Sequence, residues 1–450
     1  MPKTINPYNN KPVFSYNTLI EKEVRNKLII SEKSYSNWKL TALKIRVKYL
    51  LNLSKVLKNK EQELAEMITQ EMGKPITQSL AEVQKCAVLC EYYGQNVENF
   101  LQPQKIASDA QKSYVYYDSL GVILGVMPWN FPFWQVFRFA VPTIMAGNTV
   151  VVKHASNVMG CAALLETVFA AAGFPEGVYQ NLAIESKMVE AVLADPIVKA
   201  VSLTGSEGAG SAVAATAGKY LKKSLLELGG SNAFIICKDA DLKKAVPIAV
   251  NARMQNAGQS CIAAKRFLVQ SDVYDQFIQH YKEAVAKLQP GDPMDPATEI
   301  GPMAREDLAE ELEKQVQDSV RMGAEIVYGG KRTGTFFEPT VLVHVTPEMP
   351  AFKEELFGPV AAVSVFETIE EAIQLSNTSS FGLGVSVFSE DTAGIEAKVH
   401  LFEEGAVFIN AMVKSDPRLP FGGVKKSGYG RELSDTGLLE FVNIKTIYIS

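Results

Sequence analysis

The chain has 450 residues, of which 47% are hydrophobic and 21% are charged, which is typical of a globular protein with two to four domains. With 31 glycines and 21 prolines it is neither collagen-like nor of low complexity. The net charge of −5 disfavours a basic nucleic-acid-binding protein. No uncharged apolar run reaches the length of a membrane span, and residues 1–7 lack the apolar core of a signal peptide.

The cysteines and histidines give no sign of a disulfide framework or a metal site. The cysteines are odd in number and scattered, which suits a reducing cytoplasm. Cys86 and Cys90 lie one helical turn apart, but a metal site would need further ligands nearby, so we interpret them as packed core thiols. The four histidines lie far apart: His154, His280, His344 and His400.

The predicted elements begin with a helical region and continue as alternating strands and helices. Leucines at three- and four-residue spacing predict helices over residues 16–102, interrupted at 73–75. Residues 113–118 have a strand composition. The next strands are expected at 122–127, 149–152, 177–182, 200–203 and 225–227, with helices over 135–145, 160–172 and up to 222. This alternation predicts a parallel sheet covered on both faces.

A second α/β alternation begins at residue 231. Strands are expected at 233–237, 265–270 and 360–366, and helices at 241–255, 275–288 and 305–322. A final strand over 441–449 is typical of a sheet edge or of an inter-subunit strand.

Unusual polar residues follow four of the predicted strands. They are Asn130, Lys153, the loop Gly205–Gly210 and Glu227. Because ligands bind at the carboxyl ends of parallel strands, four such ends predict one shared crevice.

The loop and the lysine are compatible with a phosphate-bearing ligand. Backbone N–H groups of Gly205–Gly210 open a helix and would attract phosphate, although the loop matches neither GxGxxG nor a Walker motif, and a plain strand–helix turn remains the alternative. Lys153 would need an acceptor such as ribose or phosphate if it is buried; otherwise it is a surface lysine.

Three further residues could carry chemistry. Cys261 follows a polar loop where a thiolate would be solvated and reactive, the alternative being an inert core thiol. Glu227 has apolar neighbours that would raise its pKa and make it a general base, unless it is a paired structural carboxylate. Asn130 could donate to an oxyanion, or it could form an Asx turn.

Together these motifs resemble the aldehyde dehydrogenase superfamily. The residues that carry the resemblance run in family order along nearly the whole chain: Pro128-Trp-Asn-Phe-Pro132, Lys153, Thr204-Gly-Ser206 with Gly210, Leu226-Glu-Leu-Gly-Gly230, Gly258-Gln-Ser-Cys261, Glu354-Glu-Leu-Phe-Gly-Pro359 and Pro420-Phe-Gly-Gly-Val-Lys-Lys-Ser-Gly428.

The resemblance implies a role for each candidate. Cys261 would be the nucleophile that attacks the aldehyde, Asn130 and the Cys261 backbone N–H would hold the oxyanion, and Glu227 would activate water. NAD or NADP would be the cofactor, with Glu355 on the nicotinamide ribose and Phe357 beside it. The full implied cofactor set is Trp129, Lys153, Ser156, Thr204, Gly205, Ser206, Gly210, Leu228, Glu355 and Phe357.

The longer matching stretches are similar to the bacterial succinate-semialdehyde dehydrogenases. In that group the position of Arg138 carries an arginine that grips the distal carboxylate of the substrate, which suits a planar guanidinium; the alternative is an arginine on the outer face of its helix. The chain departs from the pattern at Gln255, where some members have a second arginine, so that Ser415 or another residue of 414–418 would assist.

Two further departures concern redox control and the cofactor. Ala263 stands where some members have a partner cysteine, so we expect no redox disulfide. Ser156 stands where NAD-selective members often have a glutamate, so NADP would be accepted.

The implied fold is α/β, with a Rossmann-like cofactor domain, an α/β catalytic domain and a small β arm. Residues 1–104 and 120–229 would form the first, 230–435 the second, and 105–119 with 436–450 the arm. The arm would join a homodimer or homotetramer in the cytoplasm, with no nucleic-acid, membrane or metal partner.

The implied reaction is oxidation of succinate semialdehyde to succinate. The alternatives are another small aldehyde (glutarate semialdehyde, lactaldehyde or a broad aliphatic range) and a catalytically silent relative.

Overall fold

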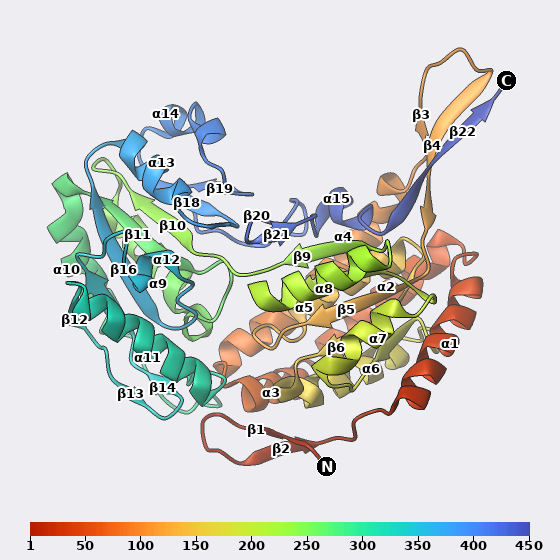
Figure 1. The fold of residues 1–450 in the computed structure, drawn as a ribbon, viewed down its shortest axis with the longest axis horizontal. Coiled ribbons are helices and arrows are strands. Elements are labelled where there is room, and N and C mark those ends of the chain that lie inside the picture. Colours follow the sequence, from red (N-terminus) through yellow and green to blue (C-terminus); the bar gives the residue numbers. More distant parts are fainter.

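The computed structural model describes residues 1–450 and contains two large sheets and a projecting three-stranded arm (Figure 1). The first sheet has the strand order β21-β9-β8-β5-β6-β7, and all its pairs are parallel except β21 with β9. Its strands are β5 (Val122–Met127), β6 (Thr149–His154), β7 (Tyr179–Asn181), β8 (Val198–Thr204), β9 (Lys223–Glu227) and β21 (Gly428–Tyr429). The strand order reverses at β5, which defines a topological switch point of the kind where ligands bind.

Alternating side chains of the first sheet enter two different cores. Val122 and Leu124 pack on one face, while Ile123 and Val150 pack on the other. The first face is covered by α1 (Glu21–Trp38), α7 (Val189–Ala194) and α8 (Glu207–Lys219). The second face carries α5 (Trp134–Met145) and α6 (Met159–Ala171), with α2 (Leu43–Asn59), α3 (Glu61–Met72) and α4 (Ile76–Phe100) packed outside them.

The second sheet has the order β12-β15-β16-β11-β10-β18-β19, with only β12 antiparallel to its neighbour. Its strands are β10 (Asn232–Ile236), β11 (Ala264–Gln270), β12 (Glu325–Tyr328), β15 (Thr340–Val343), β16 (Val360–Phe366), β18 (Val385–Phe388) and β19 (Val407–Ile409). One face is covered by α9 (Leu242–Met254) and α10 (Tyr274–Val285). The other is covered by α11 (Glu306–Arg321), α12 (Pro350–Lys353), α13 (Ile369–Asn377) and α14 (Thr392–Glu396).

The arm leaves the body of the molecule and carries the C-terminus at its tip (Figure 1). It consists of β3 (Gln104–Lys105), β4 (Lys112–Ser119) and β22 (Val442–Ile449), in the order β22-β4-β3. The remaining short elements are β1 (Lys3–Ile5), β2 (Pro12–Ser15), β13 (Arg332–Thr333), β14 (Phe336–Phe337), β17 (Phe381–Gly382), β20 (Val424–Lys425) and α15 (Ser434–Leu438). None of the helices has both the length and the apolar character that crossing a membrane requires.

The predicted alternation of strands and helices is confirmed, and the strands at 122–127 and 360–366 have the predicted bounds. The helical region is shorter than predicted: it begins at Glu21, since residues 16–20 form no helix or strand. The predicted strand 177–182 shrinks to three residues. The short strands β12 to β15 and β17 to β21 were not predicted, because elements of two to four residues show too little periodicity.

Two buried carboxylates fix the loops that follow β5 and β6. Glu82 Oε1 accepts hydrogen bonds of 2.9 Å from the backbone N–H groups of Phe133 and Trp134, at the start of α5. Glu71 does the same for Gly160 and Cys161 at the start of α6, at 2.8 and 2.9 Å. A carboxylate is stabilised at a helix N-terminus, so each acid both caps a helix and anchors the loop before it.

The Glu82 carboxylate is also the partner of a buried lysine. Lys74 forms an ion pair with Glu82, and neither side chain is more than 1% exposed. The Lys74 ammonium lies 3.8 Å from the ring centre of Phe131, in the loop between β5 and α5. Burial lowers the pKa of Lys74, and Glu82 opposes that shift. The pair therefore ties α3 and α4 to the loop that carries Asn130.

We predict that Glu82→Gln lowers the free energy of unfolding by about 3–5 kcal/mol, because it leaves Lys74 charged, buried and without a carboxylate. Chemical denaturation monitored by circular dichroism measures the change. Glu91→Gln on the same helix is the matched control: its ion pair with Lys58 is exposed, so about 0–1 kcal/mol is expected. Equal losses in the two variants would contradict the structural role of the buried pair.

Candidate active site

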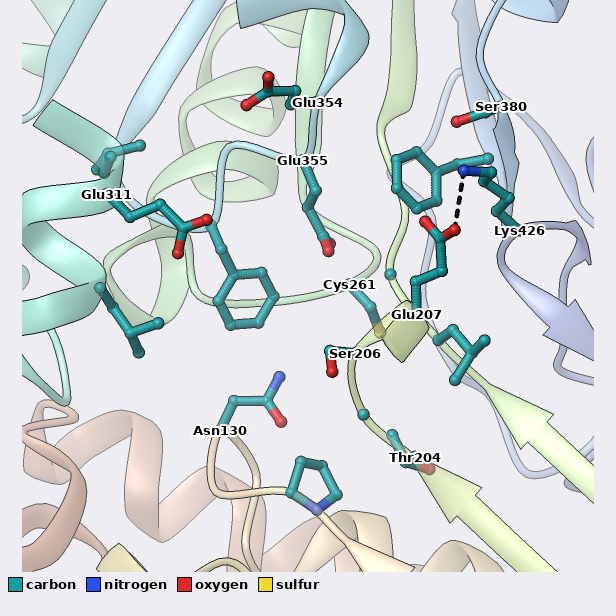
Figure 2. A pocket seen from close by; sticks show the side chains of 18 of the residues that line it. Asn130, Thr204, Ser206, Glu207, Cys261, Glu311, Glu354, Glu355, Ser380 and Lys426 are labelled. Atoms are coloured by element: carbon teal, nitrogen blue, oxygen red, sulfur yellow. Dashed lines mark ion pairs between the residues drawn. The ribbon is translucent and has the colours of Figure 1, made fainter. Parts of the chain in front are cut away.

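A cavity of about 530 Å³ lies where the two sheets face each other. Its walls come from the loops after β5, β8 and β9 of the first sheet, and from the Cys261 loop and residues 353–357 of the second. Figure 2 shows the side chains of Asn130, Cys261 and Glu355 reaching this space from different elements. The predicted site residues that line it are Trp129, Asn130, Thr204, Gly205, Ser206, Leu228, Cys261, Glu355 and Phe357.

The loop before Cys261 has an unusual backbone. Asn256, Ala257 and Gly258 have φ angles of 56°, 49° and 72° in succession. Non-glycine residues in this left-handed region each cost of order 1–3 kcal/mol, so the surroundings must hold the loop in place. A side chain at Gly258 would collide with the carbonyl of Gly358, which makes glycine necessary at this position.

Hydrogen bonds from buried side chains hold this loop. The Asn256 amide donates to the carbonyl oxygens of Asn130, at 2.9 Å, and Gln259, at 3.1 Å. The Asn130 amide also donates to the Gln259 carbonyl, at 3.1 Å. Arg253 is fully buried and donates to Val360 O at 2.6 Å, fixing the end of α9 against the second sheet. The loops of Asn130 and Cys261 are therefore one connected unit, although they belong to different sheets.

Positive side chains surround the half-buried Cys261 thiol. Burial raises its pKa to about 11, while Arg138 and Lys265 oppose that shift and the carboxylates of Glu227 and Glu355 add to it. The Lys265 ammonium donates to the carbonyl oxygen of Cys261 itself, at 2.8 Å. Losing the thiol proton thus requires a base nearby or a further positive charge.

Two N–H donors are available for an oxyanion beside the sulfur. The backbone N–H of Cys261 makes no hydrogen bond within the chain. The Asn130 amide uses one of its two N–H groups on Gln259 O, which leaves the second directed at the cavity (Figure 2). This is the donor pair that stabilises a tetrahedral alkoxide in acyl-transfer chemistry.

Glu227 ends β9 and is 1% exposed, with neither carboxylate oxygen hydrogen-bonded by a side chain or backbone donor. Burial raises its pKa well above the ordinary value, and the carboxylate of Glu432 adds to that rise, while Arg138 and Arg431 oppose it. Gly422 leaves the space for it, since a side chain there would come within 2.8 Å of Glu227 Oε1. A buried, unpaired acid of this kind is suited to proton transfer.

The opposite part of the cavity has the features of a dinucleotide site. Helix α8 begins there, with Ser206 as its N-cap and the Thr204 hydroxyl buried without a partner. The rings of Trp129 and Phe357 meet edge to face, with 5.7 Å between their centres. Glu355 is oriented by the Gly230 backbone N–H at 3.0 Å and by Lys265 at 2.9 Å.

Three residues implied for cofactor binding do not line this cavity. Lys153 lies at the end of β6, where burial lowers its pKa and its only partner is Ser186 Oγ at 3.4 Å. Ser156 is exposed and borders a second cavity beside the N-terminal hairpin. At Gly210 a side chain would approach Leu228 to 2.6 Å, so this glycine permits close packing of α8.

The two residues expected to bind a substrate carboxylate are both buried. Arg138 is not on an outer helix face: it forms an ion pair with Glu432, and its guanidinium lies 4.5 Å from the ring centre of Phe421. Ser415 Oγ accepts hydrogen bonds from Trp134 and from Lys85. Gln255 is exposed and borders a separate cavity.

Sequence reasoning missed Asn256, Lys265, Glu432 and Lys85. Lys265 gives a weak signal, because Lys265 and Arg266 are two cations in a buried strand whose other residues are mainly apolar. The other three give none: their partners are Asn130, Arg138 and Ser415, and only folding brings each pair together.

The aldehyde dehydrogenase family model matches residues 2–447, and this chain belongs to that family. A probable NADP(+) succinate-semialdehyde dehydrogenase of Synechocystis is 45% identical over 99% of both chains. A succinate semialdehyde dehydrogenase [NAD(P)+] of Escherichia coli is 46% identical over 95% of this chain and 93% of its own. The crystal structure of the succinic semialdehyde dehydrogenase from Streptococcus pyogenes with NADP+ superposes with a TM-score of 0.97, 37% identity and full coverage of both chains.

The raised pKa of Glu227 predicts a pH dependence. A carboxyl whose pKa is raised acts as a base only above that raised value, so turnover should still increase with pH well above the range in which an ordinary carboxyl ionises. Glu227→Gln should lower kcat by about 10²- to 10⁴-fold and abolish that increase. Steady-state rates across pH measure both effects, with Glu91→Gln as the control. A Glu227→Gln enzyme with an unchanged pH profile would refute the assignment of the base.

Proposed function

We propose that this enzyme oxidises succinate semialdehyde to succinate with NAD or NADP. The observation that carries the proposal is the pair of buried polar groups Arg138 and Ser415: the Arg138 charge acts on the Cys261 thiol and its guanidinium lies against the Phe421 ring, while Ser415 accepts a hydrogen bond from Trp134. A guanidinium and a hydroxyl are suitable donors for a carboxylate. The relatives named for this reaction, at 45–46% identity over nearly the whole chain, support the same substrate.

The residues at the start of α8 and around Trp129 fit a dinucleotide. The unpartnered Thr204 hydroxyl, the exposed N-terminus of α8 and the Lys153 cation, which lacks a carboxylate partner, offer donors for ribose and phosphate. Glu355 would hold the nicotinamide ribose, with Phe357 and Leu228 at the ring. When bound, NAD(P)+ supplies the hydride acceptor and a positive charge near the Cys261 sulfur.

The chain's own residues then act in sequence. Cys261 first loses its thiol proton to solvent, the thiolate Sγ attacks the aldehyde carbon, and the alkoxide formed is held by the Asn130 amide and the Cys261 N–H. Loss of hydride from this tetrahedral carbon leaves a thioester on Cys261. Glu227 removes a proton from water, which attacks the thioester and releases the acid and the thiol.

The parts of the fold would divide this work. Residues 1–104 and 120–229 would bind the cofactor, and residues 230–435 would carry the nucleophile. Strand β21 belongs to residues 230–435, but it pairs with β9 and so joins the first sheet. The arm would pair with a neighbouring subunit in a homodimer or homotetramer. The support is that β22 is an edge strand whose large apolar side chains are exposed: Ile444, Tyr448 and Ile449.

We assign the enzyme to the cytoplasm. Its cysteines are odd in number, and four of the five are free thiols buried in the core, as in proteins kept in reducing surroundings.

The direct test compares succinate semialdehyde with butanal, which has the same chain length without the carboxylate. We expect a kcat/KM about 100-fold higher for the semialdehyde, since charge-assisted hydrogen bonds to the carboxylate contribute about 1.5–3 kcal/mol each. Reduced cofactor formation measures the rates. Faster turnover of glutarate semialdehyde, lactaldehyde or butanal would overturn the assignment and favour the corresponding alternative substrate.

Ser156 provides a separate test of cofactor choice. Ser156→Glu should raise the KM for NADP at least tenfold through repulsion of the 2′-phosphate, while the KM for NAD changes little. Ser156→Gln, of similar size but neutral, is the control and should leave both values close to those of the natural chain. A similar loss with Gln would show that size rather than charge is responsible.

A further inference from the structure

Lys85 on α4 is a half-buried cation without a carboxylate partner. Its ammonium donates a 2.7 Å hydrogen bond to Ser415 Oγ and lies 4.1 Å from the ring centre of Trp134. No acidic oxygen lies within 4 Å of it, whereas the buried lysines Lys74 and Lys265 each have a glutamate partner. A desolvated ammonium that meets only a hydroxyl and an aromatic face would be stabilised by an anion.

Ser415 is arranged to share that anion. Its oxygen accepts from both Lys85 and Trp134 Nε1, the latter at 3.1 Å. Its own hydroxyl proton has no acceptor within the chain, so it remains free to donate. Lys85 and Ser415 thus offer two donors at one place, from α4 and from the segment before α15.

Arg138 is a second positive charge near Lys85, but its charge is already balanced by Glu432. Its positive charge influences the pKa of both Cys261 and Lys85. Its ion pair with Glu432 is buried on both sides, so a substrate carboxylate that approached Arg138 alone would also meet the Glu432 anion. A substrate carboxylate would be held better by a cation that has no carboxylate partner of its own, and Lys85 is such a cation.

We infer that Lys85, together with Ser415, binds the distal carboxylate of the substrate. The positive charge of Lys85 is not balanced by any carboxylate of the chain, and it makes the enzyme prefer an aldehyde that carries a carboxylate. The inference rests on the proposed function and names a substrate-binding residue for it. Arg138, held by Glu432, forms the inner wall, with Trp134 one helical turn away on the same face of α5.

Ionisation of Lys85 gives the inference a pH signature. Burial, and after it the Arg138 charge, lower the pKa of Lys85, while Cys86, Glu82 and Asp416 oppose the shift, and the net pKa is about 8. These are the charged groups that face it from α4, α5 and the Ser415 segment. The ammonium is therefore lost as pH rises above about 8, while the substrate carboxylate stays ionised throughout.

The experiment measures the ratio of kcat/KM for succinate semialdehyde to that for butanal, because ionisation of Cys261 and Glu227 affects both substrates and cancels. Lys85→Met should lower the ratio about 10- to 100-fold, mainly through the KM for the semialdehyde. The ratio of the natural chain should fall between about pH 7 and pH 9.5, and that of Lys85→Met should be flat. Lys85→Arg should keep a high ratio across this range, because guanidinium stays charged.

The control is Lys48→Met, an exposed lysine on α2 that should leave the ratio unchanged. Thermal melting checks that each variant is folded. A Lys85→Met enzyme that keeps the natural ratio, or that loses activity equally on both aldehydes, overturns the inference. A natural chain that shows no preference for the semialdehyde instead overturns the proposed function, so the two failures are distinguishable.

Discussion

The whole site depends on the left-handed turn formed by Asn256, Ala257 and Gly258 before Cys261. Its backbone is unfavourable in isolation, so it persists only because Asn256 bonds to Asn130 and Gln259 and because Arg253 anchors the end of α9. The same bonds place the oxyanion donor and the sulfur on one rigid unit. The hydrogen bonds that fix Asn130 relative to Cys261 are thus the same bonds that join the loops of the two sheets.

Buried charged side chains fix other parts of the structure. Glu71 and Glu82 cap the helices that follow β6 and β5, and so fix the loops at the switch point of the first sheet. The backbone N–H groups of these helices satisfy Glu71 and Glu82, whereas neither carboxylate oxygen of Glu227 has a hydrogen-bond partner of good geometry. Burial raises the pKa of both Glu71 and Glu227, but at Glu71 the backbone donors of Gly160 and Cys161 oppose the rise.

The buried lysines show the same contrast. Lys74 and Lys265 have carboxylate partners and hold the fold and the nucleophile loop. Lys153 and Lys85 have only serine hydroxyls as hydrogen-bond partners, and we propose that the first meets an anionic group of the cofactor and the second the carboxylate of the substrate. An unpaired cation is costly in the free protein, and a ligand anion would relieve that cost.

The sequence alone determined the α/β alternation and the polar strand ends, and it singled out Asn130, Glu227 and Cys261 as candidate site residues, because these features depend on local periodicity and on contiguous residues. Only the tertiary structure decided that Arg138 is paired with Glu432, that Gly210 serves packing, that Gln255 lies outside the pocket and that Lys85 meets Ser415. The last pair is 330 residues apart along the chain, and no local pattern encodes such a contact. Which side chain a buried charge meets depends on how the helices and sheets pack together, and sequence periodicity does not specify that packing.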